Sequence, residues 1–236
     1  MERIGFVGTG AMGSALLSRL KLANVPAVAF DIAPKAMEAA RAEGAQTLNS
    51  AKEVAQASTI IDVVVRTDQE VLDCTLGNNG IIEGAAPGSI VLLHSTIRPT
   101  TTKKVAQAAA DKRVNVIDAC MTAVPSVVRQ GGLTFLVGGQ KAFFDRARPH
   151  LLNMAKDAVY MGPLGCGNVT KLFNRHHTCN SVADKRKHLS RSGVEDQRFI
   201  VNDKILVEGE SSWASLDDDR CIDPIDPLRD LMDVCP

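Results

Sequence analysis

Short apolar runs alternate with mixed apolar and charged stretches along the first two thirds of the chain. The runs are rich in Val and Ile and nearly continuous, which is typical of strands covered on both faces. They predict strands at Ile4–Val7, Ala27–Phe30, Ile60–Val65, Ile90–Leu93, Val114–Asp118, Leu133–Val137 and Ala158–Tyr160. The mixed stretches predict helices at Ala11–Leu22, Pro34–Glu43, Ala51–Gln56, Asp68–Leu72, Thr101–Ala110 and Lys141–Met154.

Strict alternation of strands and helices predicts an α/β fold with a Rossmann-type, doubly wound parallel sheet. Ligands of such sheets bind outside the carboxyl ends of the strands. We therefore expect the loops Gly8–Gly13, Arg66–Gln69 and Ser95-Thr96 to converge on one site. Beyond about residue 175 the pattern is lost, because Arg175 to Ser192 holds few apolar residues.

A glycine-rich turn joins the first predicted strand to the first predicted helix. It has the spacing G-x-G-x-x-G, and Asp31 closes the next strand. The first glycine allows a tight turn, the second lets a pyrophosphate approach the backbone, and the third permits close helix packing. The helix N-terminus attracts phosphates, and the acid suits a ribose. We predict NAD as cofactor, with NADP as the alternative, bound by Gly8, Thr9, Gly10, Ala11, Met12, Gly13 and Asp31.

Composition excludes several other classes of function. Lys plus Arg and Asp plus Glu both number 27, so no net field attracts nucleic acid or anionic membranes. No apolar run approaches the roughly 20 residues of a membrane helix, and no targeting segment is recognised. We expect a cytoplasmic protein that binds neither nucleic acid nor membrane. No metal site is predicted, since His176-His177 and Cys179 lack a second ligand cluster.

Four motifs together resemble one family, the β-hydroxyacid dehydrogenases. This is the group around 3-hydroxyisobutyrate dehydrogenase and 6-phosphogluconate dehydrogenase. The resemblance covers residues 1 to about 174. The motifs are IGFVGTGAMG at the start, STIRP at Ser95–Pro99, DACMTAVPSVVRQGGLTFLVGG at Asp118–Gly139, and GPLGCGNVTKLFN at Gly162–Asn174.

The resemblance implies an NAD(P)-dependent oxidoreductase. Such an enzyme transfers a hydride between the cofactor and a small β-hydroxyacid or its aldehyde or ketone. By resemblance, Lys171 handles the proton of the substrate hydroxyl, while Thr122 and Asn174 orient the substrate. The nicotinamide half would be lined by Arg66, Thr67, Ser95 and Thr96. The resemblance also implies an NAD(P)-binding domain at residues 1–163, followed by a short, incomplete helical domain at 164–236.

The sequence departs from the family pattern in three places. Thr122-Ala123-Val124 stands where the family has a serine and two glycines, and Arg175 replaces a second asparagine after the lysine. The tail is also shorter and more polar than the family's helical domain, which weakens the expectation of a homodimer. Two alternative functions follow: a dinucleotide-binding sensor or interaction module without turnover, and an imine reductase.

Overall fold

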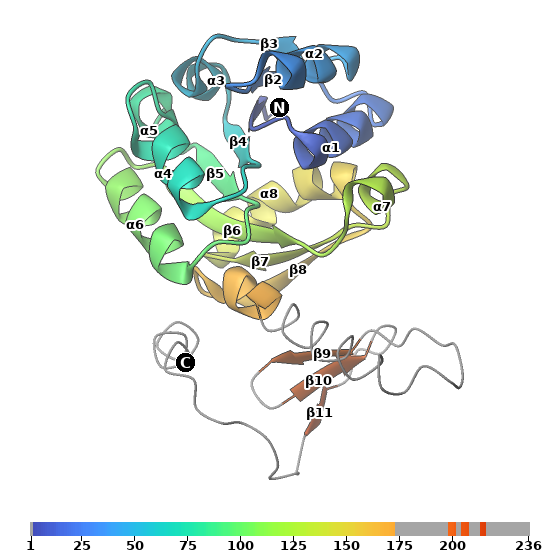
Figure 1. Cartoon of the computed structure of the whole chain (residues 1–236). Helices are drawn as coiled ribbons and strands as arrows, with labels where there is room; N and C mark the ends of the chain where they lie inside the picture. The colour runs from blue at the N-terminus through green and yellow to red at the C-terminus, as the bar shows by residue number, and fades with distance from the viewer. Residues whose placement is uncertain (1, 173–197, 202–203, 208–212, 216–236) are drawn as a thin grey trace.

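One eight-stranded sheet organises the chain (Figure 1). The structure, a computed structural model, describes residues 2–172 and the backbone of three short strands further on. The strand order is β3-β2-β1-β4-β5-β6-β7-β8, and all neighbours run parallel except the antiparallel pair β6 and β7. The strands are β1 Ile4–Val7, β2 Ala27–Phe30, β3 Gln46–Thr47, β4 Ile60–Val63, β5 Ile90–Leu93, β6 Asn115–Met121, β7 Thr134–Gly138 and β8 Asp157–Gly162.

Helices cover both faces of this sheet, as Figure 1 shows. Buried side chains of α1, α2, α7 and α8 form a core on one face, and those of α3 to α6 form a second core on the other. The helices are α1 Ala11–Leu22, α2 Pro34–Ala42, α3 Ala51–Ala57, α4 Asp68–Leu76, α5 Ile81–Gly84, α6 Pro99–Ala110, α7 Pro125–Arg129 and α8 Lys141–Met154.

Strand β5 shows why both cores form. Ile90 and Leu92 belong to the first core, and Val91 and Leu93 belong to the second. All four side chains are fully buried. Because successive strand residues point to opposite faces, a continuous apolar run is needed here. Each such side chain stabilises the fold by about 1.5–3 kcal/mol.

The predicted α/β, doubly wound sheet is confirmed, with local differences. The strand predicted at Ile60–Val65 ends at Val63, and that predicted at Val114–Asp118 extends to Met121. Strand β3 and helices α5 and α7 were not predicted. The antiparallel direction of β7 relative to β6 was not predicted either.

The tail is described only in part. A helix begins at Cys166 and is described to residue 172. Further on, strands β9 Arg198–Val201, β10 Lys204–Val207 and β11 Trp213–Ser215 form an antiparallel sheet in the order β11-β10-β9. These strands differ from the helical structure predicted for this stretch. The division into domains 1–163 and 164–236 stays a prediction.

A buried carboxylate flanked by two histidines lies inside the first core. Oδ1 of Asp62 in β4 is 2.7 Å from Nε2 of His94, and Oδ2 is 2.8 Å from Nε2 of His150 in α8. The other ring nitrogen of His94 lies 2.8 Å from the carbonyl of Ala119. Burial raises the pKa of Asp62, but the opposing effect of the two histidines is larger, so the pKa falls below its ordinary value, to about 2. This cluster ties β4, the end of β5, β6 and α8 together.

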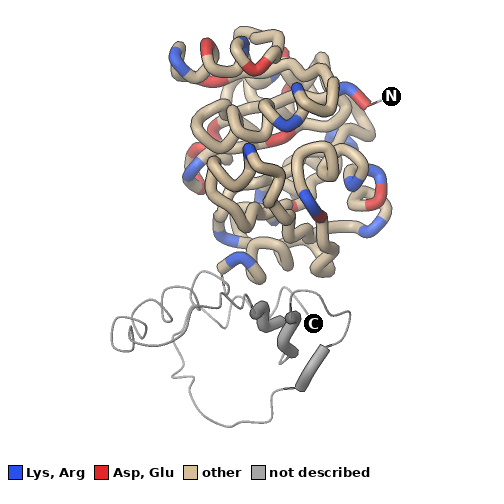
Figure 2. Tube along the Cα trace, turned by 90° about the vertical axis from the view of Figure 1, so that its right-hand side faces the viewer, with Lys and Arg blue, Asp and Glu red and all other residues tan. Residues whose placement is uncertain are grey.

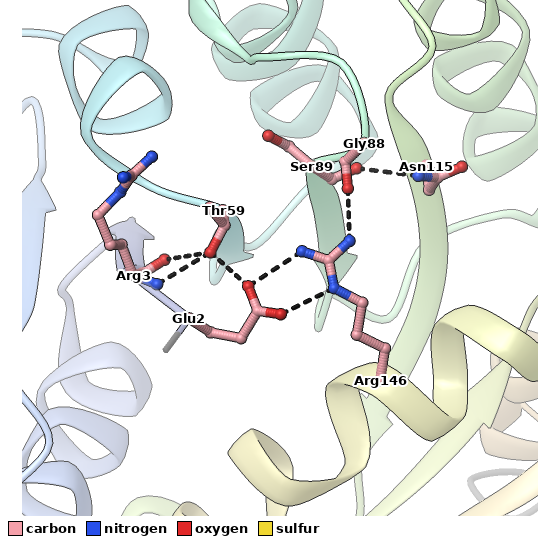
Figure 3. Close-up of polar contacts among 7 residues, drawn as sticks. All are labelled: Glu2, Arg3, Thr59, Gly88, Ser89, Asn115 and Arg146. Carbon is pink, nitrogen blue, oxygen red and sulfur yellow. Dashed lines mark hydrogen bonds and ion pairs between the residues drawn. The ribbon is translucent and has the colours of Figure 1, made fainter.

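A second polar cluster joins the amino ends of three strands (Figure 3). Glu2 accepts a hydrogen bond from Thr59 before β4 and two from Arg146 of α8, at 2.8 and 3.0 Å. Arg146 also donates to the carbonyl of Gly88 before β5, at 2.6 Å. The bonds from Arg146 hold the pKa of Glu2 at about 2, below its ordinary value.

Replacing Arg146 with methionine is expected to lower the free energy of unfolding by about 1 kcal/mol. The methionine keeps most of the apolar stem but removes the ion pair, which is partly solvated and therefore modest in strength. Thermal unfolding at neutral pH measures the change, with Lys103→Met, an exposed position on α6, as the control. Equal melting temperatures for the two variants would show that the Arg146 cluster is energetically neutral.

Charges of both signs are interspersed along the described trace (Figure 2), in keeping with a formal net charge of zero. Among the described residues, no helix has the length and apolar character needed to cross a membrane. Within the same part of the chain, no group of three or more His, Cys, Asp or Glu residues is arranged to hold a metal ion.

Candidate functional site

Three loops meet at the carboxyl edge of the sheet, because β1, β4 and β5 are parallel neighbours. Ser95 after β5 is buried and its hydroxyl donates to the carbonyl of Val65 after β4, at 2.7 Å. Gly8 after β1 approaches the same connection, since a Cβ on it would lie 2.3 Å from the Val64 carbonyl oxygen. The structure thus brings together the loops that were expected to converge.

Each glycine of the turn has a distinct environment. Gly8 has a φ of +92°, and its amide donates to the Phe30 carbonyl at the end of β2. A Cβ on Gly13 would lie 2.2 Å from the Gly8 carbonyl oxygen, so this glycine lets α1 start directly against the turn. Gly10, which precedes Ala11 and Met12 at the start of α1, is exposed. A Cβ on Gly10 would have no other atom within 4 Å. The second glycine therefore leaves open space where a phosphate is expected.

Asp31 is held in place by the turn that it faces. Its Oδ2 accepts a hydrogen bond from the amide of Thr9 at 2.7 Å, and its Oδ1 accepts one from Ala33 at 2.8 Å. Thr9 is buried and its hydroxyl donates to the Ala36 carbonyl in α2. A carboxylate oxygen can accept more than one hydrogen bond, so both oxygens retain capacity for ribose hydroxyls.

Arg66 and Thr67 follow β4 at the start of α4. The Arg66 side chain is 89% exposed and pairs with Glu70 at 3.2 Å. Thr67 is the N-cap of α4 and its hydroxyl accepts from the Glu70 amide. Such an exposed pair is weak, so the guanidinium can leave it for a ligand at little cost. Thr96, in the neighbouring loop after β5, is half-buried.

Lys171 lies on the helix that begins at Cys166 and is half-buried. This helix contacts the carboxyl end of β6, because Asn168, three residues before Lys171, donates a hydrogen bond to the Cys120 thiol at 3.1 Å. Burial and Asp118 raise the pKa of that thiol far above its usual value, while Asn168 and the positive charge of Lys171 oppose the rise. The predicted site residue Asn174, and Arg175 after it, lie outside the described residues.

Thr122, which was predicted to orient the substrate, forms hydrogen bonds with the backbone of Thr134 in β7. Its hydroxyl donates to the Thr134 carbonyl at 2.9 Å and accepts from the Thr134 amide at 3.2 Å. The single hydroxyl proton is therefore already used. To donate to a substrate carboxylate, Thr122 would have to release this bond, so its geometry favours a structural role in joining β6 and β7.

Two residues of this region were missed from the sequence. Asp118, near the end of β6, accepts bonds from backbone amides at the start of the Lys171 helix. Asn168, on that helix, donates to the Ser95 carbonyl and to the Cys120 thiol. The available signal was an acid near the end of an apolar strand, where the chain reads VNVIDAC.

Comparison with known proteins shows which family the chain resembles. Residues 3–162 match the family described as the NAD binding domain of 6-phosphogluconate dehydrogenase. A 3-hydroxyisobutyrate dehydrogenase of Pseudomonas aeruginosa is 34% identical over 174 residues, which cover 74% of this chain and 58% of that protein. An NAD-dependent L-serine dehydrogenase of the same organism is 32% identical over the same shares.

Solved structures extend this likeness to the fold. The 3-hydroxyisobutyrate dehydrogenase of Mycobacterium tuberculosis, solved with L-serine, has a TM-score of 0.71 and 26% identity over 80% of this chain and 66% of its own. An imine reductase from Pseudomonas sp., at 19% identity and a TM-score of 0.70, shares the fold. The chain spans 58% of the length of each of the two Pseudomonas aeruginosa dehydrogenases named above. The chain belongs to the β-hydroxyacid dehydrogenase family, as the matched residues show.

Proposed function

We propose that the chain binds NAD at the glycine turn and exchanges a hydride with a small β-hydroxyacid or its aldehyde or ketone. One observation carries this proposal: the glycine turn, the Ser95 loop and the Lys171 helix meet at one edge of the sheet. Such a reaction requires a turn that binds the dinucleotide and a group that exchanges a proton with the substrate. The glycine turn and Lys171 supply these two parts at the same edge of the sheet.

The residues present fit a dinucleotide. The open side of Gly10 admits the pyrophosphate, and the first turn of α1 supplies free backbone amides and the positive end of a helix dipole. Asp31 presents an oriented carboxylate to the adenosine ribose. When bound, the cofactor supplies the group that accepts or donates the hydride. The residues of the turn bind and orient it.

Lys171 is proposed to exchange a proton with the substrate hydroxyl. A lysine amine held against the substrate can give a proton to the carbonyl oxygen during reduction and take it back from the hydroxyl during oxidation. The names of the relatives indicate the substrate class. Serine and 3-hydroxyisobutyrate each carry a hydroxyl on the carbon β to a carboxylate.

A screen for turnover tests the proposed function. The chain is incubated with NADH and small aldehydes or ketones derived from β-hydroxyacids, and with NAD and the hydroxyacids, while NADH absorbance is followed. We expect turnover with at least one of these compounds. Cyclic imines with NADH or NADPH are added to the same screen. Cofactor binding without turnover would favour the sensor or interaction module instead, and turnover only with the cyclic imines would favour an imine reductase.

NAD(H) is expected to bind more tightly than NADP(H). The Asp31 carboxylate accepts bonds from the ribose hydroxyls and repels a 2′-phosphate, and the adjacent Ile32, 90% exposed, supplies no cation. The double change Asp31→Ser with Ile32→Arg should reverse this preference. Calorimetric titration with both cofactors measures it, and tighter binding of NADPH to the unmodified chain would contradict the assignment of Asp31.

A further inference from the structure

One buried carboxylate organises the start of the helix that carries Lys171. Asp118 is fully buried near the end of β6. Its Oδ1 accepts a hydrogen bond from the amide of Gly165, and its Oδ2 accepts one from the amide of Asn168, both at 2.7 Å. The amide of Gly167 is a further donor to it. The carboxylate therefore satisfies backbone donors that a helix N-terminus leaves unpaired.

Two glycines give this carboxylate its space. A Cβ on Gly138 of β7 would lie 2.6 Å from Oδ1 of Asp118. A Cβ on Gly167 would lie 2.7 Å from Oδ2 and 2.4 Å from the Leu136 carbonyl oxygen. Any side chain at either position would displace the carboxylate or the backbone. The helix and β7 are thus fitted closely around Asp118.

Asn168 connects the same helix turn to the cofactor side of the site. Its side-chain amide donates to the Ser95 carbonyl at 3.4 Å and to the Cys120 thiol at 3.1 Å. Its Oδ1 accepts from the hydroxyl of Thr102 in α6 at 2.7 Å. Asn168 and Thr102 are fully buried. Lys171 lies three residues further on, one helical turn away and on a neighbouring face.

The geometry favours the ionised form of Asp118. Burial raises the pKa of this carboxyl, while the amides of Gly165, Asn168 and Gly167 oppose the rise. These partners of its oxygens are all donors, and a carboxylate is the form that only accepts. An uncharged amide at this position would place its NH₂ group against a backbone N–H.

We propose that Asp118 is a positioning residue: its carboxylate fixes the start of the helix against the Ser95 loop and thereby places Lys171 beside the reacting hydroxyl. This inference rests on the proposed function of Lys171. Asp118 does not touch the reacting atoms. It sets where the proton-exchanging group lies, and a displacement of about 1 Å at such a group lowers the rate by as much as about 10²-fold.

The test compares Asp118→Asn with Asp157→Asn in the full chain. Asp157 begins β8 and also accepts a backbone amide bond, from Ala158 at 2.7 Å, but it does not contact the Lys171 helix start. We expect Asp118→Asn to lower kcat by about 10- to 100-fold, with NAD affinity within about twofold of the unmodified chain. The control should keep its kcat.

A second readout does not depend on turnover. Competitive acylation with acetic anhydride at a series of pH values, followed by mass spectrometry of the Lys171 peptide, reports the reactivity and titration midpoint of this amine. We expect Asp118→Asn to change both and Asp157→Asn to change neither. If the unmodified chain turns over no substrate, the proposed function fails while this readout still decides the position of Lys171.

A milder variant covers the case in which Asp118→Asn does not fold. Thr102→Val removes the hydroxyl that anchors Asn168 and is nearly isosteric. It should change kcat and Lys171 reactivity in the same direction by a smaller factor. Folded variants, verified by circular dichroism, that keep both the kcat and the acylation profile of the unmodified chain would overturn the proposal.

Discussion

Replacing Lys171 with alanine is expected to lower kcat by about 10²-fold or more, with nearly unchanged affinity for NAD. Loss of a positioned acid or base typically costs about 10²- to 10⁴-fold in rate. The cofactor phosphates are expected at the glycine turn before α1, whereas the helix that carries Lys171 contacts Cys120 near the end of β6. Steady-state kinetics and calorimetric titration with NAD, carried out on the same preparation, separate the two effects.

The control for this prediction is Lys103→Ala, at an exposed position on α6. It removes one positive charge without removing the proposed catalytic amine, so kcat should not change. Added small primary amines should restore part of the activity of Lys171→Ala, because they supply the missing base. A Lys171→Ala variant with full kcat would remove the catalytic assignment.

Replacing Asp62 with alanine is expected to lower the free energy of unfolding by about 3–5 kcal/mol. The change leaves His94 and His150 in the core without their shared acceptor, and His94 is completely buried. The cost of breaking a buried pair exceeds that of an exposed one because the remaining groups cannot be solvated. Urea denaturation at neutral pH measures the difference.

The matched control is Asp73→Ala, because Asp73 is an exposed acid on α4 whose carboxylate accepts one side-chain bond, from Gln69. Its effect should stay within about 0.5 kcal/mol. A loss below about 1 kcal/mol for Asp62→Ala would show that the two histidines find other partners.

Acid should weaken the fold through the same residue. The pKa of Asp62 is about 2 in the folded chain and 3.8 as an ordinary aspartate. Its contribution is therefore complete above about pH 4 and is lost as the pH falls toward 2. The shift corresponds to about 2–3 kcal/mol. The unmodified chain should lose this much more stability than Asp62→Ala across that interval.

The apolar pattern predicted most of the sheet. Strands β1, β2 and β5 and helices α1 and α8 have the predicted bounds. Such runs must be continuous wherever both faces of a strand are covered. Strand β3 was missed because it holds two residues, Gln46 and Thr47, too few for any periodicity.

The antiparallel direction of β7 depends on tertiary geometry. Helix α7 has five residues, about 8 Å, and cannot run back along the roughly 20 Å of β6, as a parallel crossover requires. The apolar character of β7 is the same in either direction. The chain direction therefore could not be predicted from the strand's composition.

The sequence predicted the local geometry of the candidate site, but not its contacts between distant residues. The conformation of the glycine turn and its contact with Asp31 agree with what the spacing along the chain predicts, while the cofactor-binding roles of these residues stay predictions. The contact between Asp118 and Asn168 joins residues 50 positions apart. A hydroxyl such as that of Thr122 has no sequence signal for whether it faces a substrate or the neighbouring strand, which here is β7.

Deuterium transfer tests the central claim most directly. The chain is incubated with NADH deuterated at the reactive face of the nicotinamide C4 and with aldehydes or ketones derived from small β-hydroxyacids, and the products are analysed by mass spectrometry. We predict one deuterium on the hydroxyl-bearing carbon of the product, lost in Lys171→Ala. Tight binding of NADH with no deuterium in any product would contradict the account and leave a nucleotide-binding chain without hydride transfer.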